Sequence, residues 1–244
     1  MAKKVTAIVL AAGKGSRMNS DIPKQYLSLL GKPVLFYSLQ AFEKSNADEI
    51  ILVTGSGEQE YCQKEIIEKY HLNKVVHIVE GGAERYHSVH RGLLTAKESD
   101  YVLIHDGARP LISTAVINAA IDKVKENGAC VVGMPVKDTI QIVDEECMIC
   151  STPERKYTWL AQTPQCFAFE LALSSYNKAI ESNDNTLTDD AMVVRRYGNA
   201  SVSMLQGGYE NIKVTTPEDI SMAECFLKMR SDDTMQADEE IKIQ

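Results

Sequence analysis

The stretch that decides the fold is Val5-Thr-Ala-Ile-Val-Leu-Ala-Ala-Gly13-Lys-Gly-Ser-Arg17, near the start of the chain. Residues 5–10 are apolar or β-branched, which is typical of a strand buried on both faces. Glycines follow at once, and a glycine-rich turn after the first strand is where α/β sheets bind phosphate groups. The segment therefore predicts a buried first strand with an anion cradle at its carboxyl end.

After this first segment, short β-branched runs alternate with amphipathic stretches as far as residue 135. Further strands are expected at 49–54, 74–80, 101–105 and 129–135, and helices at 33–44, 59–70, 84–98 and 113–127. This alternation predicts a Rossmann-like α/β fold, with a mostly parallel twisted sheet and helices on both faces.

The rhythm changes after Pro135. Alternating, turn-rich sequence predicts a β-hairpin arm that projects from the main domain at about 137–161. Later elements are expected as helices at 169–182 and 189–197, strands at 201–206 and 211–215, and a helix near Pro217 capped by Thr216. We expect a single domain over 1–230, and the acidic segment 231–244 is typical of a disordered tail.

Composition bounds the function classes. The chain has 244 residues and a formal net charge of -8, which argues against non-specific nucleic-acid binding. No apolar run approaches the roughly 20 residues that span a bilayer, and the short first apolar run reads better as a strand than as a signal peptide. A cytosolic protein without membrane partners is expected. Cys147 and Cys150 form a Cys-x-x-Cys, either a redox or metal pair or, as we favour, two thiols on a hairpin.

The glycine-rich loop fits neither of two common phosphate-binding motifs. A dinucleotide fingerprint needs a third glycine where Met18 stands and an acidic residue near Thr54, where the second strand ends. A Walker A loop needs Gly-Lys-Ser/Thr, which is missing here. What remains is a backbone cradle with two nearby cations, Arg17 and Lys24, which can stabilise charge on a phosphoryl group in transfer.

With Pro23-Lys24-Gln25 at this spacing, the loop resembles the signature of the sugar nucleotidyltransferases, and its Pro-Lys-Gln form resembles the cytidylyltransferases of that group. Further motifs fit the same family in order over about residues 5–228. They are Gly81-Gly-Ala-Glu-Arg85 with Ser88, His105-Asp-Gly-Ala-Arg-Pro110, Asp138-Thr-Ile140, Gln162-Thr-Pro-Gln165, Thr188-Asp-Asp190 and Asn211-Ile-Lys-Val-Thr215.

The resemblance implies a Mg²⁺-dependent enzyme that transfers a cytidylyl group from CTP to a small sugar-alcohol phosphate. His105-Asp-Gly-Ala-Arg-Pro110 and Asn211-Ile-Lys-Val-Thr215 favour the family members that use 2-C-methyl-D-erythritol 4-phosphate, in isoprenoid biosynthesis. Two alternatives stay open: a D-ribitol 5-phosphate cytidylyltransferase of cell-wall polymer synthesis, and a catalytically silent nucleotide-binding regulator. Since the acceptor phosphate is mostly dianionic near neutral pH, the reaction requires no general base.

The resemblance also implies roles for individual residues. The expected catalytic residues are Arg17, Lys24, Arg155 and Lys213. The expected substrate-binding residues are Ala11, Ala12, Gly13, Gly15, Gly82, Ser88, Asp106, Arg109, Thr139 and Thr188. In the family the arm embraces a second subunit, so a homodimer is implied in which Arg155 and Thr139 serve the partner's site. The metal's protein ligands stay unassigned.

Two polar residues beside these have alternative roles. His105 precedes Asp106 and by strand alternation points to the other side of the sheet, as a neutral core histidine. Asp189 either orients the acceptor or caps the helix that follows it.

Overall fold

The computed structural model describes residues 3–13, 22–184 and 186–242, with side chains described as far as Arg230. Its main sheet has seven strands in the order β11-β7-β10-β6-β1-β4-β5. The strands are β1 (Val5–Ala11), β4 (Glu49–Thr54), β5 (Val75–Glu80), β6 (Tyr101–Asp106), β7 (Ala129–Pro135), β10 (Trp159–Ala168) and β11 (Ser203–Gln206). β10 runs antiparallel to both its neighbours and the other pairings are parallel, so the mostly parallel sheet predicted from the sequence is confirmed.

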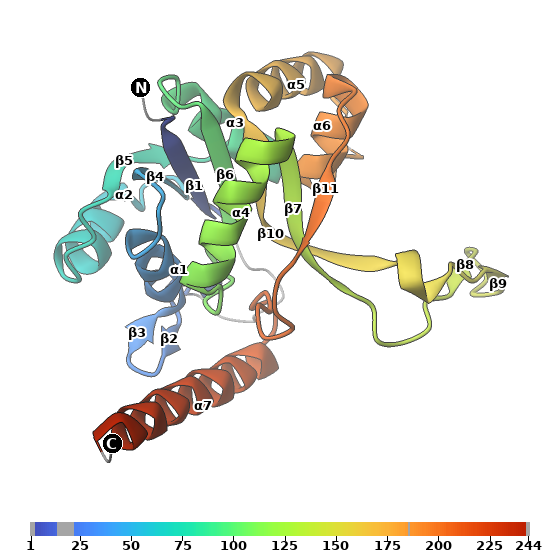
Figure 1. Ribbon diagram of the computed structural model, residues 1–244. Coiled ribbons are helices and arrows are strands. Elements are labelled where there is room, and N and C mark those ends of the chain that lie inside the picture. The colour runs from blue at the N-terminus through green and yellow to red at the C-terminus, as the bar shows by residue number, and fades with distance from the viewer. Residues whose placement is uncertain (1–2, 14–21, 185, 243–244) are drawn as a thin grey trace.

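Helices cover both faces of this sheet (Figure 1). They are α1 (Val34–Glu43), α2 (Gln59–Tyr61) continuing as the π-helix η3 (Cys62–Glu68), α3 (Arg85–Thr95), α4 (Thr114–Asn127), α5 (Phe169–Ser182), α6 (Asp190–Gly198) and α7 (Pro217–Lys242). One apolar core joins the sheet to α1, η3 and α4, and a second joins it to α3, α5 and α6. None of the described helices combines the length and apolar character needed to cross a bilayer.

The strand order places a site at one end of the sheet. The chain moves outward from β1 through β4 to β5, and then returns to form β6 on the other side of β1. Leu10 of β1 lies beside Asp106 of β6, and Ala11 lies beside Thr54 of β4. In open α/β sheets ligands bind at such a reversal, outside the carboxyl ends of the strands.

The segment between β7 and β10 projects from the main body (Figure 1). It contains an antiparallel pair, β8 (Ile142–Val143) and β9 (Ile149–Ser151), and the short helix η4 (Arg155–Tyr157). Residues 159–161, which the sequence assigned to this arm, belong instead to β10 and pair with β7. We use "the arm" below for residues 136–158.

The strand predicted at 211–215 is wrong, because its backbone groups have other partners. The Asn211 carbonyl accepts a hydrogen bond from Arg109, and the Val214 amide donates to Ala108, so no ladder forms. At the chain end, α7 begins as predicted after Thr216, whose backbone amide donates to the Asp219 carboxylate. The helix continues through residues 231–242, where the sequence favours a disordered tail.

Candidate active site

A cavity of about 910 Å³ opens at the carboxyl ends of β1, β4, β5 and β6. Among the described residues it is lined by Leu10, Ala11, Ala12, Gly13, Pro23, Lys24, Gln25, Gly55, Ser56, Glu58, Glu80, Gly81, Gly82, Ala83, Glu84, Arg85, Ser88, Arg91, Asp106, Ala108 and Lys213. The volume falls at the upper end of the range for small-molecule sites. The predicted anion cradle and the second glycine-rich turn therefore face one space.

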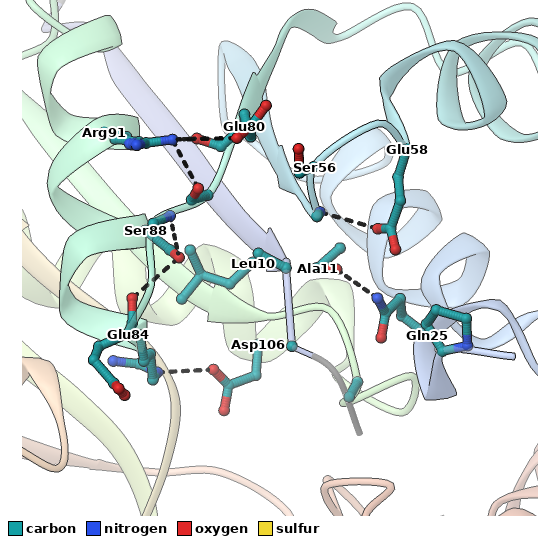
Figure 2. Close-up of a pocket in the computed structure, with 18 of the residues that line it drawn as sticks. Leu10, Ala11, Gln25, Ser56, Glu58, Glu80, Glu84, Ser88, Arg91 and Asp106 are labelled. Carbon is teal, nitrogen blue, oxygen red and sulfur yellow. Dashed lines mark hydrogen bonds and ion pairs between the residues drawn. The ribbon is translucent and has the colours of Figure 1, made fainter. Parts of the chain in front are cut away.

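Lys24 is carried by a short turn, η2 (Lys24–Tyr26), that is anchored on both sides. The buried Gln25 amide donates a 2.6 Å hydrogen bond to the Ala11 carbonyl at the end of β1 (Figure 2). The Tyr26 hydroxyl donates to Glu58 at 2.7 Å, and Glu58 also accepts from the Gly55 amide. These bonds fix the backbone on which Lys24 reaches the cavity.

The second glycine-rich turn forms the opposite wall and is held by side chains of α3 (Figure 2). The Ser88 hydroxyl accepts from the Gly82 amide at 3.0 Å and donates to the Glu84 carbonyl. Arg91 donates to the carbonyls of Glu80 and Gly81, at 3.1 and 2.7 Å. The turn therefore presents a fixed set of backbone groups to the cavity.

Asp106 is the centre of charge at the cavity floor. Its carboxylate lies 2.9 Å from Lys213 Nζ, 3.3 Å from Arg85 Nε and 3.9 Å from Arg109 Nε. Burial alone would raise the pKa of Asp106, but the charges of Arg85, Lys213 and Arg109 outweigh it and hold that pKa well below its ordinary range. An ionised carboxylate with three cationic neighbours is thus built into this chain.

Arg85 connects Asp106 to a second, fully buried carboxylate. Its two terminal nitrogens lie 2.6 and 2.8 Å from the Asp190 oxygens, in the bidentate arrangement. The Tyr176 hydroxyl also donates to Asp190. Burial and the nearby Asp190 charge raise the pKa of Tyr176, so its phenol stays protonated as a donor.

His105 lies on the other face of β6 and is fully buried. Its ring packs edge-on against Phe42, with Nδ1 3.1 Å from the Thr163 hydroxyl and Nε2 3.3 Å from the Arg109 carbonyl. Burial lowers the pKa of His105 to about 4, so the ring is neutral near pH 7. This agrees with the core histidine predicted from strand alternation, and no histidine is among the described residues that line the cavity.

The predicted site residues fall into three groups. The first group lines the cavity: Ala11, Ala12, Gly13, Lys24, Gly82, Ser88, Asp106 and Lys213. Arg109 belongs with it, because its Nε lies 3.9 Å from the Asp106 carboxylate. Gly15 and Arg17 lie outside the described residues. Thr139 and Arg155 lie on the exposed arm, and Thr188 is exposed before α6, so these three do not line the described cavity.

Sequence reasoning missed several residues that hold this site. Gln25 and Arg85 stand inside quoted motifs, but their side-chain partners come from other parts of the chain. Asp190 was missed because two acidic residues at a helix start read as a cap. Asp189 does cap α6, accepting from the Met192 amide, whereas Asp190 turns inward. The sequence pattern shows two adjacent acidic residues, but it does not show that the second of them is buried.

The amino-acid sequence matches the family model of 2-C-methyl-D-erythritol 4-phosphate cytidylyltransferase over residues 5–229. A curated protein of that name from Lachnoclostridium phytofermentans is 49% identical over 230 residues, covering 94% of this chain and 99% of its own length. Another from Lachnospira eligens is 50% identical over 225 residues, covering 91% and 99%.

Solved structures agree with these matches. A 4-diphosphocytidyl-2C-methyl-D-erythritol synthase from Anaerococcus prevotii superposes with a TM-score of 0.81 at 34% identity, covering 93% of this chain and 96% of that one. A 2-C-methyl-D-erythritol 4-phosphate cytidylyltransferase from Thermus thermophilus superposes with a TM-score of 0.73 at 28% identity, covering 91% and 98%.

Proposed function

The chain belongs to the 2-C-methyl-D-erythritol 4-phosphate cytidylyltransferase family, and from this premise we propose that it transfers the cytidylyl group of CTP to 2-C-methyl-D-erythritol 4-phosphate, with release of pyrophosphate. This reaction belongs to non-mevalonate isoprenoid biosynthesis. The observation that carries the proposal is the cavity that joins the glycine-rich turns to the cation cluster around Asp106.

The bond changes require little acid–base chemistry from the protein. An oxygen of the acceptor phosphate forms a bond to the α-phosphorus of CTP, and the bond from that phosphorus to the oxygen bridging to the β-phosphate breaks. Pyrophosphate leaves with that oxygen and its electron pair. Because the acceptor phosphate is mostly dianionic at neutral pH, no proton must be removed from it, in keeping with the neutral, hydrogen-bonded His105 behind the site.

For CTP, the residues at the two glycine-rich turns have separate tasks. The cradle around Ala12 and Gly13 would hold the triphosphate, and the fixed backbone at Gly82 with Ser88 would contact cytosine. Lys24, on its anchored turn, would offset the charge that develops as the α-phosphorus becomes pentavalent. We assign Arg17 to the same task from the family motif.

The acceptor phosphate would meet Lys213. The Lys213 side chain lines the cavity and is 36% exposed, so its ammonium can contact a phosphate with little rearrangement. Its present partner, Asp106, keeps Arg85 and Arg109 when Lys213 moves.

The family resemblance implies Mg²⁺, and the donors here fit it. The described residues contain no cluster of three or more metal-binding side chains, but Mg²⁺ with a triphosphate commonly uses one or two carboxylates, the phosphate oxygens and water. Asp106 is ionised and lines the cavity, so it would contribute one carboxylate oxygen once Lys213 has moved from it to the acceptor phosphate, and phosphate oxygens and water would supply the other ligands. When bound, Mg²⁺ offsets charge on the triphosphate.

We also propose a homodimer in which the arm reaches the partner's site. Arg155 and Thr139 lie on the arm rather than along the cavity. The arm also exposes large apolar side chains, among them Met148, Ile149 and Tyr157, which a second subunit would cover. We also propose a cytosolic location, because we interpret residues 5–10 as a strand rather than as part of a signal peptide.

The first test is pyrophosphate release from CTP and Mg²⁺ with 2-C-methyl-D-erythritol 4-phosphate and, in parallel, D-ribitol 5-phosphate. We expect strong preference for the first acceptor. Preference for the second would move the protein to polymer synthesis with the same phosphoryl chemistry. Activity that is unchanged in the presence of a chelator would contradict the Mg²⁺ assignment.

A mixing experiment tests the dimer. Lys24→Ala and Arg155→Ala proteins are assayed separately, then unfolded together and refolded at equal concentration. If Arg155 serves the partner's site, each mixed dimer contains one intact site, so activity should return to about one quarter of the wild-type level. If Arg155 serves its own chain, both sites of a mixed dimer are defective, and mixing restores nothing.

A further inference from the structure

The ion pair of Arg85 with Asp190 is fully buried at its carboxylate end, whereas the Arg85 side chain is 31% exposed and lines the cavity. Asp190 is fully buried, and its carboxylate takes the two terminal nitrogens of Arg85 and the Tyr176 hydroxyl. Burying an ion pair is costly, and replacing it with apolar residues of the same volume often leaves the stability of a fold unchanged or raises it. The pair therefore calls for a role besides stability.

That role follows from the third nitrogen of the guanidinium. While its two ends are held by Asp190, Nε of Arg85 lies 3.3 Å from Asp106 at the cavity floor. A guanidinium is planar and rigid, so fixing its two ends fixes the direction of Nε. The orientation of the Asp106 carboxylate is thus set by a buried anchor on α5 and α6, elements that lie behind the cavity wall.

We propose that Arg85, clamped by Asp190 and Tyr176, is a positioning residue that keeps Asp106 oriented when Lys213 leaves it for the acceptor phosphate. This inference rests on the proposed function and deepens it. The three cations around Asp106 differ in freedom: Lys213 reaches it from a loop on a flexible stem, whereas Arg85 and Arg109 have second attachments. Of the two that stay, Arg85 is the nearer to the carboxylate, at 3.3 Å against 3.9 Å for Arg109.

A second ion pair of the chain shows what a pair without this task looks like. Arg196 contacts Asp184 on the surface, where the arginine side chain is 43% exposed, and neither residue lines the described cavity. Arg196→Gln is therefore a matched control, since it removes an arginine–aspartate pair without touching Asp106.

The test is a double-mutant cycle with Asp190→Asn and Asp106→Asn, measured as kcat with saturating CTP and acceptor. We expect Asp190→Asn to lower kcat by about 10- to 100-fold in the wild-type background and by less than about 2-fold when Asp106 is already replaced. Arg196→Gln should leave kcat unchanged. Equal losses in both backgrounds would mean a structural role only and would overturn the proposal, as would unchanged kcat in Asp190→Asn.

Tyr176→Phe provides a milder variant if Asp190→Asn fails to fold, because it removes one hydroxyl from the clamp and keeps the ring. It should show the same dependence on Asp106, with a loss of about 3- to 10-fold, and an equal loss in both backgrounds would overturn the proposal.

A readout independent of the acceptor separates this inference from the proposed function. In crystal structures without substrate, Asp106 should keep its orientation in Lys213→Ala, because Arg85 still holds it, and should lose that orientation when Lys213→Ala is combined with Tyr176→Phe or Asp190→Asn, whatever acceptor the enzyme uses. An Asp106 carboxylate that keeps its orientation in the combined variants would overturn the positioning role even in an active enzyme. A changed orientation in an enzyme whose wild type is inactive with 2-C-methyl-D-erythritol 4-phosphate would keep the positioning role and reject the acceptor.

Discussion

The cavity floor and the arm both present charged residues, but in opposite settings. At the floor Asp106 is buried beside three cations, and two of these have second attachments: Arg85 to Asp190, and Arg109 to the Asn211 carbonyl. On the arm Arg155 is exposed and donates a 3.3 Å hydrogen bond to the Lys137 carbonyl.

The difference shows which part of the function one chain can prepare by itself. The floor is preorganised by contacts within the chain, so its electrostatics are set before any ligand arrives. The arm lacks such a buried network among its described residues, and in the proposed homodimer the partner's surface would fix its side chains. Substitutions in the two regions should therefore differ in what they change: those at the floor should alter turnover and stability, and those on the arm should alter association.

Lys24→Ala should produce the largest effect. In its proposed role the ammonium offsets charge that is greatest in the transition state, so we expect kcat to fall by roughly 10²–10³-fold with little change in CTP affinity. Steady-state kinetics and calorimetric titration of CTP measure the two quantities. An equal loss in CTP binding and in turnover would contradict the transition-state role and reduce Lys24 to a ground-state contact.

The next prediction concerns how protein stability depends on pH through His105, in the core on the face of β6 opposite the cavity floor. Burial holds the pKa of His105 at about 4 in the folded protein, against an ordinary value of 6.5. The unfolded chain therefore binds more protons between these values, and stability is lost as the pH falls from 6.5 to 4. The expected loss is about 3 kcal/mol, by the usual free energy per pKa unit.

Urea unfolding of the wild type and His105→Gln across this pH range measures that loss. Asp106 has the opposite sign of charge and a lowered pKa, so its contribution is lost only at lower pH. If both proteins lose stability equally between pH 6.5 and 4, His105 is not the group responsible.

A third prediction concerns the wall above the floor. A Cβ added at Gly81 would lie 2.4 Å from Ala12 Cβ and 2.8 Å from Ser88 Oγ, so the turn must shift. We expect Gly81→Ala to raise the KM for CTP about tenfold and to lower the melting temperature by several degrees. At Gly13 the added Cβ meets no described atom within 4 Å, so Gly13→Ala should leave the melting temperature unchanged.

The smallest effect on folding is expected on the arm. Met148 is 65% exposed, so Met148→Gln should change the free energy of unfolding of the chain by less than about 0.5 kcal/mol. Sedimentation at dilute concentration should nevertheless show weaker dimerisation, since the apolar contact that the proposed homodimer gives Met148 is lost. If association is unchanged, Met148 does not lie at the dimer interface, and dimerisation does not account for its exposure.

Much of the fold could be predicted from the sequence because its signals are local. Hydrophobic periodicity predicts buried strands and amphipathic helices, and α5 begins and ends at the predicted residues, Phe169–Ser182. The family itself could be recognised from short motifs such as Pro23-Lys24-Gln25 and Asn211-Ile-Lys-Val-Thr215, because they resemble the family's motifs in residue type, spacing and order, and the family model matches residues 5–229.

Which side chains share the site became known only from the folded structure. It turned the predicted strand at 211–215 into a loop, whose Lys213 meets Asp106. It also paired Arg85 with Asp190, 105 positions away along the chain. An ion pair between residues far apart in the sequence forms only where the folded backbone brings them together. Hydrophobic periodicity describes local structure and gives no information about such contacts.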